Sequence, residues 1–340
     1  MDKRGLIYKY KLNRPLTQED IYRHLPVNKP SGAKPWYQLT VIRMNSTYLE
    51  CIDKYFLDKG LATSGMIFII LLSIWVIVAF IEITLSRCCK LDDILMTLLF
   101  CLMFSPLAAI AVYGLKKEAF QYTHYPIRFN RKTRMVYACK TDGTIIDKSW
   151  DDIYFTLVCL GTLGGGQWEP QGLILEPSPG SPPLKNADGT WNNEALKTAI
   201  VRDLFPLSTH DTFSSRHLLE QWEFIRRYME EPDELPKLAN QIAHVHDIAD
   251  RREGYGHGFQ NLITSTGGLL AYAILPVVFI YSLGRVLAMH TGKIPQWPEE
   301  IEAQCRIEPY DPYVRDGNNL VHPDDVKMPR GSFSRQQRKK

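Results

Sequence analysis

The sequence has little that would point to a nucleic-acid-binding, disulfide-stabilised or secreted protein. Its 340 residues include 40 Lys and Arg against 37 Asp and Glu, and the net charge of +3 is too small to favour nucleic acid as a partner. Seven cysteines, an odd number without framework spacing, predict no set of disulfides. The first residues are charged and lack the apolar stretch of a signal peptide. Any insertion into a membrane is therefore expected to depend on internal segments.

Common enzyme motifs are missing too. The glycine-rich segment 161–167 lacks the Lys and Ser or Thr that complete a phosphate-binding loop, and no Gly-x-Ser-x-Gly nucleophile elbow occurs. An enzyme needs titratable groups that converge in a pocket, and no spacing in the sequence indicates them. We therefore predict a protein without catalysis, and we assign no catalytic residue, no cofactor and no metal ligand.

Long apolar runs are what the sequence does contain. Segment 64–85 has one charged residue, Glu82, and segment 94–115 has none. At about 1.5 Å per residue, each run is long enough to cross a hydrocarbon core of about 30 Å as a helix. The connection is short, so we predict a transmembrane helical hairpin over 64–115, in which Pro106 kinks the second helix. The alternative is a pair of helices buried in a soluble core.

A third apolar run, 264–285, is shorter in its dense part and is interrupted by Gly267, Gly268 and Pro276. We predict a third spanning helix, and the alternative is a re-entrant or interfacial segment lying against the hairpin. The side of the membrane that the C-terminus occupies depends on this choice. Because acids inside a membrane are functional suspects, Glu82 and Arg285 form a candidate intramembrane polar pair, unless Glu82 reaches the interface.

Lys and Arg near the ends of these runs predict the orientation, because cytoplasmic flanks carry more of them. If all three runs span, one side has Arg87, Lys90 and Lys293, with Arg285 at its margin. The other side has Lys54, Lys59, Lys116, Lys117, Arg128, Arg251 and Arg252. We therefore expect the N-terminus and the long middle segment to be cytoplasmic.

The remaining segments predict a mixed α+β protein. Residues 1–63 form an N-terminal cytoplasmic segment with a short helix after Thr17, a strand over 36–43 and a helix over 45–57. Residues 118–232 form a small antiparallel β domain with a C-terminal capping helix near 212–229, the plan of pleckstrin-homology-like (PH-like) domains. Its expected strands cover 127–129, 135–140, 145–150, 154–160 and 172–176. A polar helical connector (233–263) and a polar tail (290–340) complete the chain.

A basic turn closely follows the second apolar run. Its charged residues are Arg128, Arg131, Lys132 and Arg134. One interpretation is that this group faces anionic lipid, where each basic residue near the surface contributes about 1 kcal/mol to membrane binding. Topology signalling explains the same charges equally well.

Three segments together resemble an uncharacterised bacterial membrane-protein family, the domain-of-unknown-function family 6708. They are MNSTYLECIDKYFLDKG (44–60), PIRFNRKTRMVYACKTDGT with its WDDI (126–153), and WEFIRRYMEE (222–231). The resemblance covers residues 36–300 and implies two helices before a PH-like domain, with another apolar segment after it. It also implies a link to type VI secretion gene clusters. It carries over no catalytic residues.

We therefore expect an integral protein of the bacterial inner (cytoplasmic) membrane whose PH-like domain is cytoplasmic. Its partners would be the lipid bilayer and a protein, either a toxin or a secretion component, so that it acts as an immunity or accessory protein. The alternative function is a secreted toxin (effector) that perturbs membranes. The sequence does not indicate the oligomeric state.

Overall fold

The computed structural model describes residues 10–87, 90–162, 165–207, 216–256, 259 and 275–322. Residues 264–274 of the predicted third span, 212–215 of the predicted capping helix and 323–340 of the predicted tail lie outside these ranges. The chain divides into two compact units. The sheet unit comprises the described residues of 1–56, 124–251 and 295–335, and the helical unit comprises those of 57–123 and 252–294.

A five-stranded antiparallel sheet joins segments from both sides of the apolar hairpin. Its strands are β2 (Val41–Met44), β3 (Tyr48–Cys51), β4 (Ile127–Asn130), β5 (Met135–Cys139) and β6 (Ile145–Ser149), in that order across the sheet. Strand β3 pairs with β4, so that Tyr48 lies opposite Asn130 and Cys51 opposite Ile127. The N-terminal segment is therefore part of the same fold as the domain predicted to begin at residue 118.

The helix predicted over 45–57 is wrong, because β3 lies there. The side-chain Oδ1 of Asn45 accepts hydrogen bonds from the backbone N of Thr47 (2.8 Å) and of Tyr48 (2.9 Å), which closes the turn between β2 and β3. Asn favours such turns because its side chain bonds the backbone two residues on. The strand predicted over 36–43 begins only at Val41.

A four-stranded antiparallel sheet forms the second layer of the sheet unit. Its strands are β1 (Arg14–Pro15), β9 (Ile200–Pro206), β8 (Gly165–Glu176) and β7 (Ile153–Thr162), in that order. The sequence analysis did not predict β9 or β1. Helix α1 (Gln18–Tyr22) begins at Thr17 with the predicted capping box, and the short α4 (Asn193–Leu196) precedes β9.

Helix α5 (Arg216–Glu230) fills the core of the sheet unit, as predicted for the capping helix. Its Trp222 stacks on Trp150 of the one-turn helix η1 (Trp150–Asp152), with ring centroids 5.7 Å apart, and lies 4.8 Å from the ring of Phe155 on β7. The buried face includes Leu218, Ile225 and Met229, at the 3–4 residue spacing of the sequence pattern.

The predicted helical connector is largely extended. Within 233–256, only η2 (Pro232–Glu234) and α6 (Leu235–Ala239) are helical, and 240–256 contains no helix. Apart from residue 259, the end of the predicted connector (257–263) lies outside the described residues. The backbone N of His246 donates to Val41 O (2.9 Å) on β2, and Ile242, Val245 and Ile248 are buried. This segment therefore belongs to the core. The tail adds α10 (Glu299–Gln304) to the sheet unit.

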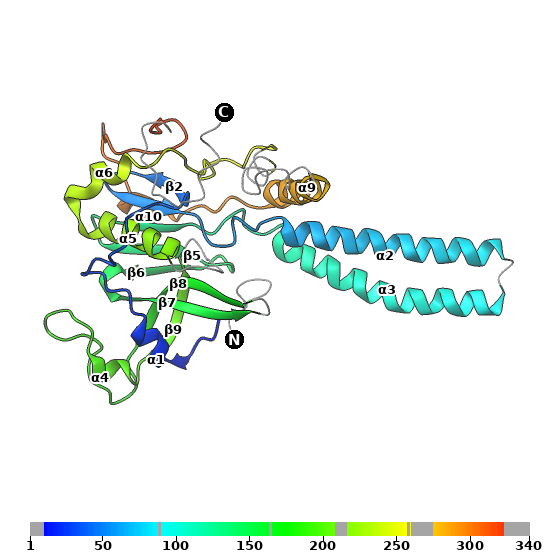
Figure 1. Cartoon of the computed structure of the whole chain (residues 1–340), viewed down its shortest axis with the longest axis horizontal. Coiled ribbons are helices and arrows are strands. Elements are labelled where there is room, and N and C mark those ends of the chain that lie inside the picture. The colour runs from blue at the N-terminus through cyan, green and yellow to red at the C-terminus, as the bar shows by residue number, and fades with distance from the viewer. Residues whose placement is uncertain are drawn as a thin grey trace. The chain divides into compact units, whose positions relative to one another are not determined.

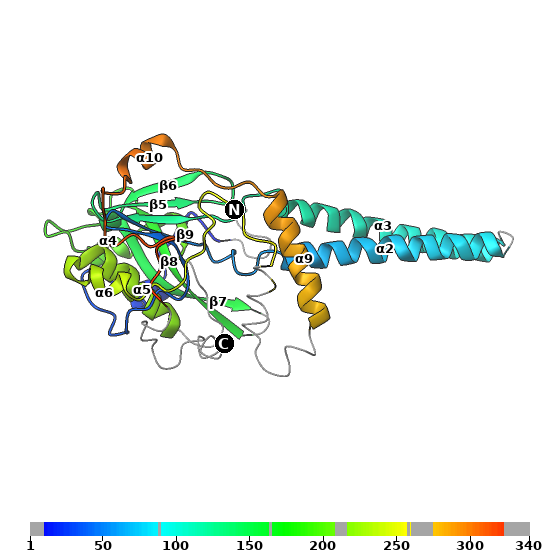
Figure 2. The ribbon, with the colours of Figure 1, turned by 90° about the horizontal axis from the view of Figure 1, so that it is seen from above.

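The helical unit contains α2 (Leu61–Ser86), α3 (Leu91–Glu118) and α9 (Leu275–Thr291). Helices α2 and α3 confirm the predicted pair of long apolar helices. Helix α2 begins three residues before the predicted run 64–85, and α3 ends three residues after the predicted run 94–115. They run side by side (Figure 1), and α9 lies across α2 instead of alongside it (Figure 2). The mixed α+β class with antiparallel sheets and two apolar helices is thus as predicted.

Candidate functional site

The α2–α3 hairpin exposes a large apolar surface along both of its helices. Both helices are long and apolar enough to cross a membrane, and only 6% of the most apolar stretch of each is buried. Large apolar side chains are exposed along both helices, among them Phe68, Leu71, Trp75, Leu99 and Leu102. The helices are therefore not core helices covered by the rest of the described chain, which was the soluble alternative.

A few polar and aromatic side chains hold the two helices together. Phe80 of α2 stacks on Phe100 of α3 with ring centroids 3.8 Å apart. Near the connection, the hydroxyls of Thr84 and Thr97 lie 2.6 Å apart, and Thr97 Oγ1 also donates to Phe80 O (3.2 Å). Hydroxyls that bond across helices are typical of membrane helix pairs.

The open end of the hairpin is closed by Glu118, the last residue of α3. Its carboxylate accepts hydrogen bonds from the backbone N of Gly60 (2.9 Å) and of Thr63 (2.5 Å), and from Thr63 Oγ1 (2.6 Å). Helix N-termini have unsatisfied N–H groups and a partial positive charge, and a carboxylate satisfies both. Glu118 thus caps α2, whose own Ncap residue, Gly60, has no side chain for that purpose.

Arg285 of α9 pairs with Glu253 and not with Glu82. Its Nε donates to Glu253 Oε2 (2.9 Å) and its Nη2 to Oε1 (3.2 Å), and both side chains are 5% exposed. Nη1 of Arg285 reaches the carbonyls of Leu57 (3.2 Å) and Lys59 (3.1 Å), which precede α2. Glu82 is exposed near the far end of α2. The predicted Glu82–Arg285 pair is therefore not formed.

Helix α9 approaches α2 through small residues. A Cβ atom on Gly284 would lie 2.8 Å from Gly60 O and would clash with the hydroxyl of Ser64. A side chain on Gly60 would clash with the backbone of Arg285, and the φ angle of Gly60 is +100°. Glycine allows both this backbone conformation and this approach. We name the contact of Gly60, Ser64, Gly284, Arg285 and Glu253 the base joint.

Three of the four residues of the predicted basic patch are paired with acids. Arg134 donates to Asp151 Oδ1 (2.5 Å) and to Glu230 Oε1 (2.8 Å), and Lys132 pairs with Glu308. Arg131 lies over the ring of Tyr228, 5.9 Å from its centroid. These pairs satisfy much of the charge within the fold, so that the turn offers less positive charge to lipid than the sequence predicts.

Arg128 is buried, with 2% of its surface exposed. It lies between the rings of Tyr48 (4.4 Å) and Trp297 (4.9 Å), and it pairs with Glu50 (3.3 Å) and Glu302 (3.0 Å). Burial would lower the pKa of the guanidinium, but the nearby acids outweigh it and raise the pKa. Arg128 therefore fixes α10 to the sheet and does not form a lipid-facing surface.

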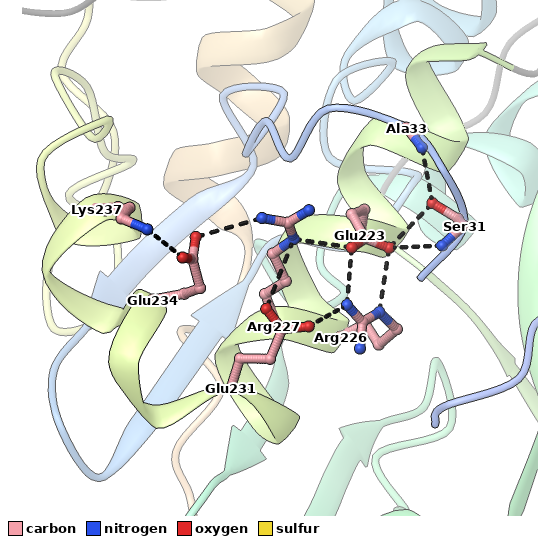
Figure 3. A network of polar contacts seen from close by, with 8 residues as sticks. All are labelled: Ser31, Ala33, Glu223, Arg226, Arg227, Glu231, Glu234 and Lys237. Atoms are coloured by element: carbon pink, nitrogen blue, oxygen red, sulfur yellow. Dashed lines mark hydrogen bonds and ion pairs between the residues drawn. The ribbon is translucent and has the colours of Figure 1, made fainter. Parts of the chain in front are cut away.

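A second charged network ties helix α5 to its surroundings (Figure 3). The carboxylate of Glu223 accepts hydrogen bonds from Arg226 (2.8 Å) and Arg227 (2.8 Å), and from the backbone N of Ser31 (2.9 Å). Burial alone would raise the pKa of Glu223, but these hydrogen bonds prevail and lower it to about 2. The network fixes the loop at residue 31 to α5, and its role is structural.

Sequence reasoning missed Glu118, which caps α2, and Glu253, the acid of the base joint. Both lie outside the predicted apolar runs, where an isolated acid is not a signal of a site. Their partners are 55 and 32 positions away, so no local spacing marks them. Within the described ranges, no group of three or more His, Cys, Asp or Glu residues is arranged to hold a metal.

Comparison with known proteins gives one match. No curated protein and no solved structure matches the chain. A family described as a family of unknown function, DUF6708, matches residues 104–309, which include α9, α5, α10 and most of the strands. Because this match covers more than half of the 340 residues, the chain belongs to the DUF6708 family.

Proposed function

We propose that the protein is an integral membrane protein that acts by binding and not by catalysis. The α2–α3 hairpin anchors it in the bilayer, and the sheet unit binds a protein partner. The observation that carries the proposal is the exposed apolar surface of two helices that are each long enough to span.

The free energy of that surface supports the anchor. Burying one large apolar side chain is worth about 1.5–3 kcal/mol. Many such side chains are exposed along the hairpin, including Leu71, Trp75, Leu98, Leu99, Leu102 and Met103. In water their exposure would cost tens of kcal/mol in total. This is at least as large as the free energy of unfolding of a typical domain, which is about 5–15 kcal/mol. In hydrocarbon the cost disappears, and each helix satisfies its own backbone.

The proposed location is the bacterial inner membrane, with the N-terminus and the sheet unit cytoplasmic. Lys59, Lys116 and Lys117 lie at the open end of the hairpin, whereas Arg87 and Lys90 flank its connection. The excess of basic residues at the open end supports this orientation by the positive-inside rule.

The order of elements supports a PH-like sheet unit. Strands β3–β6 make most of one antiparallel sheet, β7–β9 make most of the other, and α5 follows β9. On this proposal the hairpin α2–α3 is an insertion between two paired strands, β3 and β4. The partner would be a toxin or a secretion component, as the resemblance to a family linked to type VI secretion implies. The β7–β8 hairpin is a candidate surface for it, because β9 pairs with β8 only over residues 171–176.

Membrane extraction tests the anchor. The full chain is expected to stay in the membrane pellet after alkaline carbonate washing and to need detergent for release. Replacing Leu71 and Trp75 by Asp is expected to weaken retention, since each acid at a helix centre costs about 3 kcal/mol. Tyr22→Asp, at an exposed position of the sheet unit, is the control. A chain that is freely soluble without detergent would refute the anchor.

Expression without a partner tests the binding role. An immunity or accessory protein is expected to leave growth and membrane potential unchanged when it is expressed alone. It is also expected to protect cells that express its cognate toxin. Growth arrest with loss of membrane potential would instead support the alternative, a membrane-perturbing toxin.

A further inference from the structure

The C-terminal segment belongs to the same compact unit as the strands, which constrains the path of the chain. Tyr137 on β5 donates to Gln304 Oε1 (2.6 Å), and Asn130 on β4 donates to Gln304 O (2.8 Å). Met44 on β2 and Arg315 form a two-bond backbone bridge (3.0 and 2.7 Å). If α2–α3 spans a bilayer, all these segments lie on one side of it. The chain must then cross an even number of times between residues 251 and 295.

The Glu253–Arg285 ion pair tightens this constraint. The two residues are 32 positions apart and are in direct contact, so they lie at the same depth. Two further spans between them would need about 40 residues. The chain is therefore too short to cross and return between these residues, and α9 cannot be a single spanning helix. Its 17 residues also cover only about 25 Å, less than the hydrocarbon core of about 30 Å.

Helix α9 nevertheless has an exposed apolar face. Its exposed large side chains are Val277, Phe279, Ile280, Leu283 and Leu287, and no charged side chain of the helix is exposed. The polar side chains of Ser282 and Arg285 lie on the opposite, buried face. The helix is therefore amphipathic with its apolar side facing away from the protein, so that in water this face would be uncovered.

The position of α9 on the hairpin corresponds to the edge of a bilayer. The base joint contacts α2 at Gly60 and Ser64, its first turn, and Tyr281 Oη donates to Leu57 O (3.1 Å) just before that turn. This is the end of the hairpin at which Lys116 and Lys117 of α3 stand, and α9 runs across it (Figures 1 and 2). Lys116 and Lys117 mark this end of the hairpin as the one nearest the headgroups. Because α9 runs across the hairpin at this end, it lies where hydrocarbon meets headgroups.

We propose that α9 is an interfacial helix that lies in the plane of the membrane surface, with its Val277–Leu287 face buried among lipid at the boundary of headgroups and acyl chains. The occupant of this face is lipid, because α9 contacts the first turn of the apolar helix α2, where Leu61 is exposed and is preceded by the exposed Leu57. Such helices typically bury their apolar face by about 5–10 Å. Through the base joint, α9 fixes the depth of the hairpin. This inference rests on the proposed membrane anchoring.

Depth-dependent fluorescence quenching tests the inference on the full chain in lipid vesicles. A dansyl amino acid is incorporated singly at positions 277, 280 and 287 of α9, at Leu71 of α2 and at Tyr310 of the sheet unit. Bromine atoms placed either near the headgroup or near the end of the acyl chain quench it according to depth. We expect the three α9 positions to be quenched best by shallow bromines and to equal extents, Leu71 by deep bromines, and Tyr310 by neither.

Each other outcome has a distinct meaning. A spanning α9 would place positions 277 and 287 about 15 Å apart in depth, and unequal quenching of that kind would overturn the inference. Quenching at Leu71 without quenching on α9 would also overturn it, with the face then in water or covered by a second copy of the chain. If Leu71 is not quenched either, the membrane anchor itself is refuted.

Discussion

At the scale of single residues, the base joint depends on two glycines that have no side chain, Gly60 and Gly284. Gly60 and Gly284 let two helices approach so closely that a methyl group on either would overlap its neighbour. Close backbone approach through small residues is how helices associate when no hydrophobic effect drives them together. The buried Arg285–Glu253 pair then sits beside this contact, where it is shielded from water.

A glycine pair provides a matched test of the joint. We expect Gly284→Ala to destabilise the protein by about 1–3 kcal/mol, because the added methyl overpacks against Ser64 and Gly60 O. Gly65→Ala, one residue after Ser64 in α2, meets no atom within 4 Å and is expected to be neutral or to stabilise by up to about 1 kcal/mol. Thermal unfolding in detergent, followed by fluorescence, measures both. Equal melting temperatures would show that the approach of α9 to α2 is looser than described.

Glu223 gives the sheet unit an acid-sensitive contact. We expect Glu223→Gln to cost about 3 kcal/mol at neutral pH, because it leaves Arg226 buried with less compensation. The control is Glu194→Gln, which breaks the exposed Glu194–Lys197 pair and is expected to cost less than about 1 kcal/mol. Urea unfolding of each variant measures these differences.

The pH dependence of the Glu223 effect has a definite sign. The pKa of Glu223 is lowered to about 2 in the folded protein, from an ordinary value of 4.5. Its stabilisation is therefore complete above pH 4.5 and is lost as the pH falls towards 2, because the unfolded chain takes up the proton first. The difference between the wild type and Glu223→Gln should shrink over this range. A difference that grows on acidification would contradict the network.

At the scale of elements, the apolar runs and the amphipathic helix were predictable, because each is defined by its own residues. The hairpin turn at 141–144 and the spacing of Leu218, Trp222, Ile225 and Met229 are local signals of the same kind. Strand β3 was not predictable in this way. Its residues suit a helix or a strand, and pairing with β4, which is more than seventy positions away, decides between them.

The cap of α2 is also an element-scale feature. We expect Glu118→Ala to destabilise the hairpin by about 1–2 kcal/mol, because three hydrogen bonds to the first turn of α2 are lost. Glu82→Ala removes an exposed acid near the other end of α2 and is expected to change little. Helix content followed by circular dichroism during heating in detergent measures the effect. If the two variants melt alike, Glu118 does not act as a cap.

At the scale of the whole molecule, the sequence reveals the two long apolar helices but not the way the sheet unit is assembled from three separate segments. The base joint shows the same limit, since the sequence marks Arg285 as a candidate for a polar pair but does not identify its partner, Glu253, which is 32 positions away. Counting charges and apolar residues therefore identifies the helices that are long and apolar enough to cross a membrane. It does not indicate whether the third run crosses. Our inference that it does not cross depends on the contacts of the tail with Tyr137 and Asn130, which are distant in the sequence.

Reporter fusions test this path directly. With two spans, an alkaline phosphatase inserted between Arg87 and Lys90 is expected to be active, since that connection would lie outside the cytoplasm. The same enzyme fused after residue 340 is expected to be inactive, and a green fluorescent protein fused there should fluoresce. Fusions that truncate the chain after Thr291 would serve as a further comparison, because they remove α10 but keep α9. An active C-terminal phosphatase would mean that the third run crosses, and that the contacts of α10 with β4 and β5 do not form in the membrane-bound protein.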